Sequence, residues 1–597
     1  RSRLPPPHGR RATPLHGAPM LACMARRAAP KLRNQELYRG WGLDGQVLHD
    51  PEDGTPPERW GVTRGDLRLL RLEIERAVNE GRIKPSLADP FDPDDLSVGP
   101  CMHSVVRDYI APLTREAGGM SWALLRRPSG VKCDIFLTHC WQEGAYEFIN
   151  KVLASWPIGY RAAWCCILAN PQNLDVAGML REPQDSPFAK ALQAASHVMV
   201  VPTRHACIYS RIWCVYEAFL AVEQKKVVFT ASPPITSALM RSVAFGVTII
   251  TMCIACGFCT ACATDWDDEH LGSEALPRSM LFLSLALSAA SLLLWRRPWC
   301  IRYLNILGTA VTSYAWGIRI GEEQRTNTIE HAEFAMCFTF FAANEVDRIR
   351  QLRACTSAAE LARDYVGVAG AQASHQGDRA KILAAIGDER EAVDASIRVL
   401  VSCGMSTPDL RAAAAAGVDM RSAADVRWSL CAVSLLSWVL GMDFLNMVEW
   451  HEAMGMHMGG ALVLAVAWVC SEADQRAFIA MAACKLTLLS WATLGLAVWM
   501  KHRHRLGSRR ADAISESAVA VQCDHLASWV LELIAQAVLL VTMLGRGRLV
   551  RMPYIGPWLV QVLGPGCRCR TRKGAATAGD ARQREVWPQR WSTLSSV

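Results

Sequence analysis

The sequence predicts an α/β protein in which a doubly wound parallel sheet is followed by an α-helical region that crosses a membrane several times. Between residues 131 and 235, short apolar strands alternate with amphipathic helices, which is the pattern of a parallel sheet with crossover helices. From residue 242 onward the chain contains repeated uncharged runs of about the length that crosses a bilayer. The composition, 51% hydrophobic with a mean hydropathy of +0.11, fits a soluble half joined to a membrane half.

The predicted sheet contains short apolar strands separated by helices and loops. The expected strands are CDIFLTH (133–139), RAAWCCILA (161–169), HVMVVP (197–202) and KKVVFTA (225–231). The expected helices are GAYEFINKVLASW (144–156), SPFAKALQAA (186–195) and SRIWCVYEAFLAVEQ (210–224). Ser186 is a natural N-cap, and Pro187 suits the first helical turn. An earlier helix is expected within 65–81, with its apolar residues near one face: Leu67, Leu70, Leu72, Ile74 and Val78.

The apolar runs of the second half predict six or seven membrane spans. They are residues 242–264, 279–295, 303–318, 428–448, 453–471, 477–500 and 525–545, of which 303–318 is the shortest. Lys225, Lys226 and Arg241 precede the first run, and the acidic stretch DWDDEH follows it. Because basic residues mark the cytoplasmic side of a span, we expect the α/β domain to face the cytoplasm. The sequence does not identify the membrane.

The remaining segments complete the predicted domain organisation. Residues 1–35 contain basic but no acidic side chains, and we expect a disordered tail or a targeting segment. The other expected units are a Pro/Asp-rich, partly helical region (36–130), the α/β domain (131–235), a first membrane cluster of two or three helices (242–320), a soluble helical module (344–425), a second membrane cluster of about four helices (428–545) and a basic, disordered C-terminal tail (546–597).

Charge and cysteine usage exclude several functions. The net charge of +8 comes from 64 basic and 56 acidic residues, and without a basic stripe interleaved with aromatics this does not indicate nucleic-acid binding. The 22 cysteines follow no disulfide-framework spacing, so we expect reduced, buried thiols. Four of them resemble iron–sulfur ligands in spacing: Cys253, Cys256, Cys259 and Cys262. On a helix they would point in different directions, so we interpret them as small residues for helix packing.

Metal and nucleotide-triphosphate chemistry are not indicated by the motifs. His139, His197 and His205 are scattered, without the paired spacing of metal ligands. The sequence contains no GK[ST] phosphate loop. Charged residues inside predicted spans could line a polar path, since intramembrane charges tend to be functional: Asp443, Lys485 and Glu532. A channel or transporter with a sensing soluble domain is therefore one alternative.

The stretch SRIWCVYEAFLA (210–221) places one carboxylate, Glu217, among large apolar side chains. Trp213 lies four residues earlier and shares its helix face. Glu217 is either a helix residue ion-paired with Arg204 or Arg211, or a carboxylate positioned for catalysis. The residue pattern alone leaves both interpretations open.

About 100 of the 597 residues resemble the Toll/interleukin receptor (TIR) domain, which implies a flavodoxin-like fold. The resemblance depends on the order of strands and helices and on two motifs. Its opening strand carries Asp134, Ile135 and Phe136, and its later signature consists of Ser210, Trp213, Cys214 and Glu217. The whole soluble half, with its T-H-x-W element of His139 and Trp141, also resembles uncharacterised large protein families of dinoflagellate-type algae.

The resemblance implies a function, with one residue carried over as a candidate catalytic group. TIR domains associate with one another in signalling, and in enzymatic members the glutamate of this signature cleaves NAD⁺ at the nicotinamide–ribose bond, which suggests Glu217 as the catalytic residue. A fixed carboxylate would stabilise the oxocarbenium-like ribose, and no cofactor is needed beyond NAD⁺ as substrate. The loops depart from the family, because Thr138 stands where Ser is usual and Asn170 where Asp is usual.

The function expected from the sequence is therefore that of a multi-pass membrane protein. Its cytoplasmic TIR-like domain would act in signalling or scaffolding by self-association or by binding other TIR-like domains, without nucleic acid. NAD⁺ hydrolysis through Glu217 is the enzymatic alternative.

Overall fold

The protein was analysed as a computed structural model. The described residues are 38–157, 159–204, 207–263, 272–294, 297–321, 328–363, 365–373, 376–416 and 555–563, with Ser429, Ala482, Lys485, Leu549 and Met552. The predicted tail 1–35 lies outside them. So do Asp443, Glu532 and, apart from single residues, the four predicted spans between 428 and 545.

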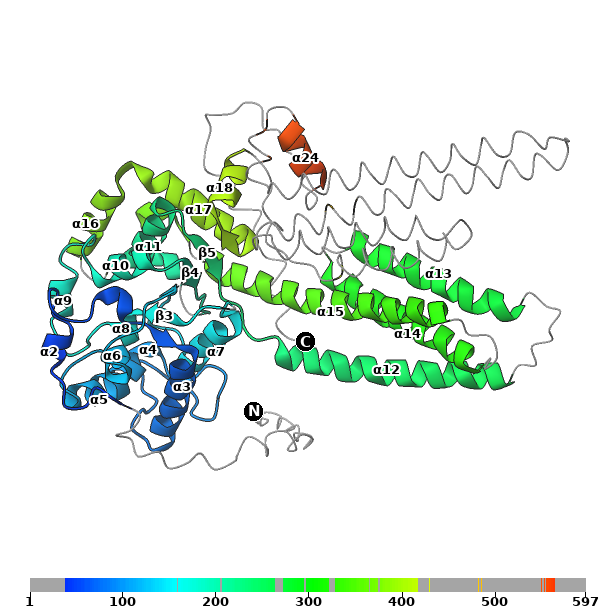
Figure 1. Ribbon diagram of the computed structural model, residues 1–597, viewed down its shortest axis with the longest axis horizontal. Helices are drawn as coiled ribbons and strands as arrows, with labels where there is room; N and C mark the ends of the chain where they lie inside the picture. Colours follow the sequence, from blue (N-terminus) through cyan, green and yellow to red (C-terminus); the bar gives the residue numbers. More distant parts are fainter. Residues whose placement is uncertain are drawn as a thin grey trace, which may run out of the picture.

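A six-stranded mixed sheet forms the centre of the N-terminal body (Figure 1), in the order β1-β3-β2-β4-β5-β6. The strands are β1 (Val62–Thr63), β2 (Ile135–Thr138), β3 (Ala162–Cys165), β4 (His197–Val200), β5 (Val227–Thr230) and β6 (Met405–Ser406). The middle strands β3, β2, β4 and β5 are parallel, whereas β1 and β6 are antiparallel edge strands. The predicted α/β class is thus confirmed.

Strands β2 and β3 are buried along their whole length, which explains why they are continuous apolar runs and not alternating ones. The predicted strand RAAWCCILA is only half right. It leaves the sheet after Cys165 and forms the short helix α8 (Cys166–Ala169). The backbone N–H of Asn170 bonds to the carbonyl of Cys166 at 3.1 Å, so the chain closes a helical turn instead of extending the strand.

The long helices of the sheet body follow the predicted periodicity and caps. They are α3 (Arg64–Asn79), α7 (Ala145–Ser155), α10 (Pro187–Ala194) and α11 (Ile212–Glu223). Ser186 caps α10 by accepting from the N–H of Ala189 at 3.3 Å, as predicted. Leu72, however, is 59% exposed, because a step of two residues from the buried Leu70 turns the side chain about 200° around the helix.

Shorter helices join these elements. They are α2 (Gly45–Leu48), α4 (Met102–Val105), the π-helical turn Val106–Ile110, α5 (Ala111–Glu116), α6 (Trp122–Arg126) and α9 (Val176–Met179). Buried apolar residues of the region before β2, including Trp60, Ile74 and Trp122, belong to the same hydrophobic core as the strands. The Pro/Asp-rich segment therefore packs onto the sheet body.

A helical bundle is inserted between β5 and β6 (Figure 1). It consists of α12 (Thr236–Ala263), α13 (Gly272–Leu293), α14 (Pro298–Gly321) and α15 (Thr328–Ala362). The chain then returns to the sheet body as α16 (Gln376–Ile386), α17 (Arg390–Cys403), β6 and α18 (Pro408–Ala415). Strand β6 pairs with β5 through Val228↔Ser406 and Phe229↔Met405, so these later residues complete the sheet.

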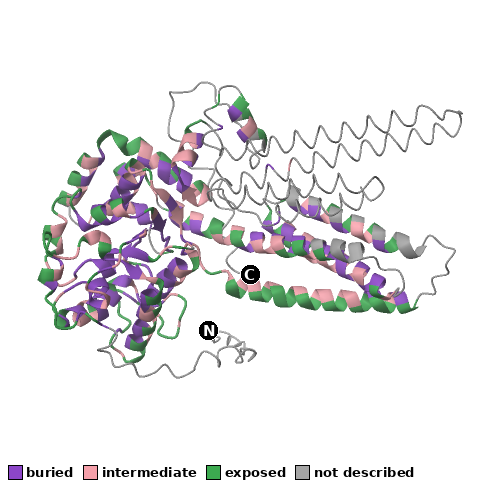
Figure 2. Cartoon of the chain, in the orientation of Figure 1, coloured by how far each residue is buried: buried purple, intermediate pink, exposed green. Residues whose placement is uncertain are grey.

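Glycines allow α12 and α14 to approach closely. A Cβ on Gly257 would lie 2.1 Å from the carbonyl oxygen of Tyr314, and one on Gly317 would lie 2.2 Å from that of Ile254. Small residues bring helix backbones together in this way. The predicted role of the α12 cysteines in packing is wrong for three of them, because Cys256, Cys259 and Cys262 are exposed. Figure 2 shows exposed residues along most of α12.

One described helix, α12, is long and apolar enough to cross a membrane, by length and composition alone. The multi-pass arrangement therefore stays a prediction. In the C-terminal segment expected to be disordered, α24 (Ile555–Leu563) is helical. Its sequence IGPWLVQVL is apolar, which corrects that expectation for these residues.

Candidate active site

The candidate site lies at the carboxyl ends of β2 and β3. Thr138 ends β2, His139 follows it, and Cys166 follows β3. The chain crosses from β3 over β2 to reach β4, so the direction of winding reverses between β2 and β4. Ligands of open α/β sheets bind outside the carboxyl ends of strands at such a reversal, and Thr138 and His139 lie on its β2 side. Helix α11 adds Arg211 and Glu217 at the same edge, as their electrostatic contacts with Cys166 indicate.

Glu217 is buried in the second turn of α11. It is 5% exposed, and its Oε2 has no hydrogen-bond partner among the described residues. Burial raises the pKa of Glu217 to about 8, against the lowering effects of the Thr138 hydroxyl and the Arg211 guanidinium. The carboxyl group is therefore largely protonated at neutral pH, and it has one oxygen free for another partner.

The ion pairs expected for Glu217 are not present among the described residues. Arg204 instead contacts Glu147 at 3.5 Å and Glu360 at 3.8 Å. Arg211 is surrounded by thiols, and its strongest electrostatic contacts are with Cys214, Cys140 and Cys166, ahead of Glu217. The interpretation of Glu217 as an ion-paired helix residue is therefore wrong for Arg204, and Arg211 contributes charge without a salt bridge.

His139 joins a carboxyl group to a thiol. Its Nδ1 lies 2.8 Å from Glu143 Oε1, and its Nε2 lies 3.1 Å from Cys166 Sγ and 3.6 Å from Cys165 Sγ. Burial lowers the pKa of His139 to about 3 and raises that of Cys166 to about 12. Burial also raises the pKa of Glu143 well above its usual range, which Lys151 and Arg211 oppose. Within the described residues, no group of three such side chains is arranged for a metal ion.

Three signature residues lie close to this edge. The Trp141 side chain is half-buried and hydrogen-bonds the Cys166 thiol. The buried thiol of Cys214 faces the carbonyl oxygen of His139 at 3.8 Å. The structure thus brings His139, Trp141, Cys214 and Glu217 together.

The other signature residues have structural positions. Asp134 lies before β2, where its Oδ2 accepts from the N–H of Arg161 at 2.7 Å. Phe136 stacks on Trp164 with ring centroids 5.0 Å apart. The Ser210 hydroxyl donates to the carbonyl of Cys207 at 2.6 Å, and Trp213 Nε1 lies 3.3 Å from Asp378 of α16. These contacts fix the strands and the start of α11.

Sequence reasoning did not identify Glu143 or Cys166 as site residues, nor Arg211 as their neighbour. One signal was present, because Glu143 follows His139 by four positions. Another was the Cys165–Cys166 pair immediately after an apolar strand. Neither spacing shows that the two segments meet, because that contact depends on the pairing of β2 with β3.

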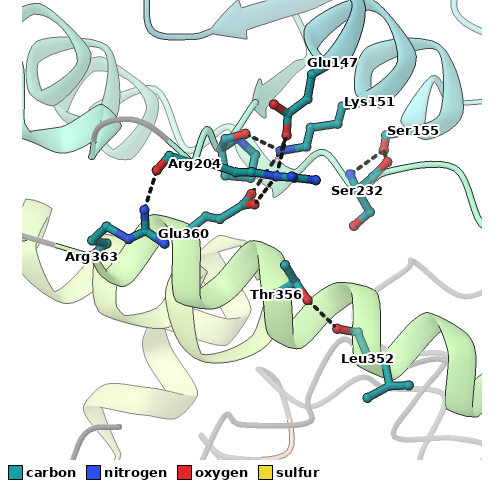
Figure 3. Close-up of polar contacts among 10 residues, drawn as sticks. Glu147, Lys151, Ser155, Arg204, Ser232, Leu352, Thr356, Glu360 and Arg363 are labelled. Carbon is teal, nitrogen blue, oxygen red and sulfur yellow. Dashed lines mark hydrogen bonds and ion pairs between the residues drawn. The ribbon is translucent and has the colours of Figure 1, made fainter. Parts of the chain in front are cut away.

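A second cluster of charges joins α15 to the sheet body (Figure 3). Lys151 of α7, 2% exposed, donates to Glu360 Oε2 at 2.9 Å and to the carbonyl of Pro202 at 2.6 Å. Glu147 Oε1 lies 2.9 Å from the same ammonium without hydrogen-bond geometry. Arg363 donates to the carbonyl of Arg204. A cation between two buried carboxylates therefore holds the end of the bundle against the sheet body.

Comparison with known proteins gives no further guidance. No protein-family model matches the chain, and neither the curated proteins nor the solved structures contain a match.

Proposed function

We propose that the chain is a multi-pass membrane protein whose cytoplasmic, TIR-like α/β domain acts in signalling or scaffolding through domain association, with α15 as the connecting element. The parallel strand order β3-β2-β4-β5 corresponds to the order 2-1-3-4 of a flavodoxin-like sheet, which supports the TIR-like assignment. The observation that carries the proposal is the buried contact of Lys151 with Glu360, since it links the bundle to the domain at a defined point.

Helix α15 has polar contacts at both ends of the connection. Near its middle, Glu345 accepts hydrogen bonds from Ser242 of α12 at 2.6 Å and from Asn305 of α14 at 3.1 Å. Asn344 donates to Ser291 of α13 at 3.1 Å. Glu360 follows Glu345 by four helical turns, about 22 Å along the axis. A displacement of the bundle would thus reach the sheet body through one continuous helix.

The test of association uses two differently tagged copies of the full chain, expressed together and recovered from membranes. We expect both tags in the membrane fraction after alkaline extraction, and each tag to recover the other after mild detergent solubilisation. A chain released by alkali would contradict the membrane assignment. Copies that never recover one another, with the α/β domain folded by circular dichroism, would contradict association.

NAD⁺ cleavage is the second candidate, favoured by the free Oε2 of Glu217 next to Thr138 at the carboxyl edge. The experiment incubates the full chain with NAD⁺ and measures nicotinamide, because residues 376–416 complete the sheet and belong in the protein tested. Glu217→Gln should abolish release, whereas Glu223→Gln, an exposed carboxylate on the same helix, should not. The absence of release from the wild-type chain at high protein concentration would end this proposal.

A further inference from the structure

The Cys166 thiol has an unusual set of neighbours for a buried cysteine. The His139 ring nitrogen faces its sulfur at 3.1 Å, and Glu143 holds the other nitrogen of that ring at 2.8 Å. A nucleophile next to a base, with the base held by a third group, is the arrangement that activates hydroxyl and thiol groups in enzymes. Two further groups stabilise negative charge on the sulfur, the Trp141 side chain by a hydrogen bond and Arg211 by its charge, whereas burial and the carboxyl groups of Glu217 and Glu143 oppose it.

Exposure distinguishes Cys166 from the thiols around it. Cys166 is 9% exposed, while Cys165 is fully buried although its sulfur lies 3.6 Å from the same ring nitrogen. This limited exposure restricts the reagents expected at Cys166 to compact, uncharged ones. A cation beside the thiol is a common feature of reactive cysteines, and Arg211 supplies it at Cys166.

We propose that Cys166 is a site of reversible oxidation by hydrogen peroxide, with His139 as the group that takes up the thiol proton. As the sulfur attacks one peroxide oxygen, the S–H proton moves to His139 Nε2, the O–O bond breaks and hydroxide leaves. The hydroxide then takes the proton from His139 and becomes water. The sulfur gains the hydroxyl group and is oxidised to sulfenic acid, the peroxide is reduced, and two equivalents of a thiol reductant restore the cysteine.

His139 takes up the thiol proton in one of its two tautomers. With Nδ1–H donating to Glu143, Nε2 presents a lone pair to the Cys166 thiol. Other titratable and charged groups reach this pair from the loop after β2, from β3 and from α11: Cys140, Cys165, Arg211, Cys214 and Glu217. Arg211 is the cation of this set, so it favours the anionic sulfur that develops during attack.

The chain contains a control thiol that lacks the histidine. Burial raises the pKa of Cys133 to about 12, as it does for Cys166, and the Cys133 thiol donates to the carbonyl of Ala191 at 3.4 Å. Cys133 is fully buried, 0% against 9% exposed for Cys166, so its rate reports whether a substitution opens the fold and not the size of the base assistance.

The experiment treats the full chain with hydrogen peroxide, traps sulfenic acid with dimedone and quantifies each cysteine by peptide mass spectrometry. We expect His139→Gln to slow trapping at Cys166 at least ~100-fold, the size of a general-base contribution, and to leave the rate at Cys133 unchanged. No adduct at Cys166, or an unchanged rate in a folded His139→Gln variant, would overturn the proposal.

The pH dependence of the trapping rate at Cys166 in the wild-type protein tests the role of His139 even where His139→Gln does not fold. Attack by a free thiolate with a raised pKa would accelerate about tenfold per pH unit. Attack assisted by His139 should instead be flat from about pH 5 to 8, because the lowered pKa of this histidine, about 3, leaves the fraction of unprotonated imidazole unchanged over that range. A tenfold rise per unit would refute the role of His139.

Discussion

Replacing Lys151 by Met tests how the bundle is held against the sheet body. The substitution keeps the length and apolar character of the side chain but removes the ammonium group between Glu147 and Glu360. Both carboxylates then stay buried, 9% and 6% exposed, and face each other's charge. The remaining cation nearby is the 63% exposed Arg204, at 3.5 and 3.8 Å, whose charge is largely screened by solvent.

The expected loss follows from the geometry. At the 2.9 Å separation of Lys151 and Glu360, two unit charges attract by about 6 kcal/mol at an effective dielectric constant of about 20. Desolvation offsets part of this attraction, and breaking one partner of a buried pair costs about 3–5 kcal/mol. Glu360→Gln should cost only about 2 kcal/mol, because Lys151 keeps Glu147 and the Pro202 carbonyl.

Hydrogen–deuterium exchange of peptides covering 352–362 measures this loss locally, since undocking exposes the backbone amides at the end of α15. A cost of 3–5 kcal/mol corresponds to exchange faster by roughly 10² to 10³ or more. Arg204→Ala is the matched control, with less than about fivefold acceleration expected. If Lys151→Met exchanged no faster than Arg204→Ala, the buried ion cluster would not be what holds α15 in place.

Three further predictions follow from residues described above. Glu217→Gln should stabilise the protein by about 3 kcal/mol at pH 7 and hardly at all at pH 4. The folded protein keeps the Glu217 proton up to its raised pKa of about 8, whereas the unfolded chain releases it at a lower pH. The stability of the wild-type protein therefore falls between about pH 4.5 and 8. Denaturation of both proteins across this range checks the sign, and parallel curves would contradict it. Gly257→Leu should separate α12 from α14, because a Cβ there would meet the Tyr314 carbonyl. Gly246→Leu is the control and should be tolerated, since a Cβ there has nothing within 4 Å. The Gly257→Leu variant should therefore unfold at a lower temperature than the Gly246→Leu variant, and equal thermal stability would contradict this prediction. Thr63→Ala should cost about 1 kcal/mol, since Thr63 and Asp66 cap α3 reciprocally, and an unchanged unfolding midpoint would count against that role.

Local sequence patterns predicted the elements that depend on local physics. The apolar runs at 133–139 and 197–202 indicated strands because parallel strands are buried on both faces. Ser186 and Pro187 indicated the start of α10 because they satisfy and preorganise a helix terminus. The same patterns singled out Glu217 as a carboxylate among apolar side chains. In the structure its side chain is buried, and its Oε2 has no hydrogen-bond partner among the described residues.

Features that depend on contacts between distant segments were beyond local patterns. Strands β1 and β6 have two residues each, too few to show a periodicity, and they pair only because the parallel sheet offers its edges. The contact of His139 with Cys166 requires β2 to pair with β3 in one register. Lys151 and Glu360 are 209 positions apart, and no spacing rule connects residues at that distance.

The late return of the chain to the sheet also matters while the protein is being synthesised. Strand β5 ends at Thr230, but its edge partner begins at Met405. At about 5–20 residues per second, a ribosome needs roughly 10–35 seconds to make the intervening chain. During that interval the outer edge of β5 has unpaired backbone groups, with which the strands of other nascent chains can pair. The chain therefore most needs protection from aggregation before β6 emerges.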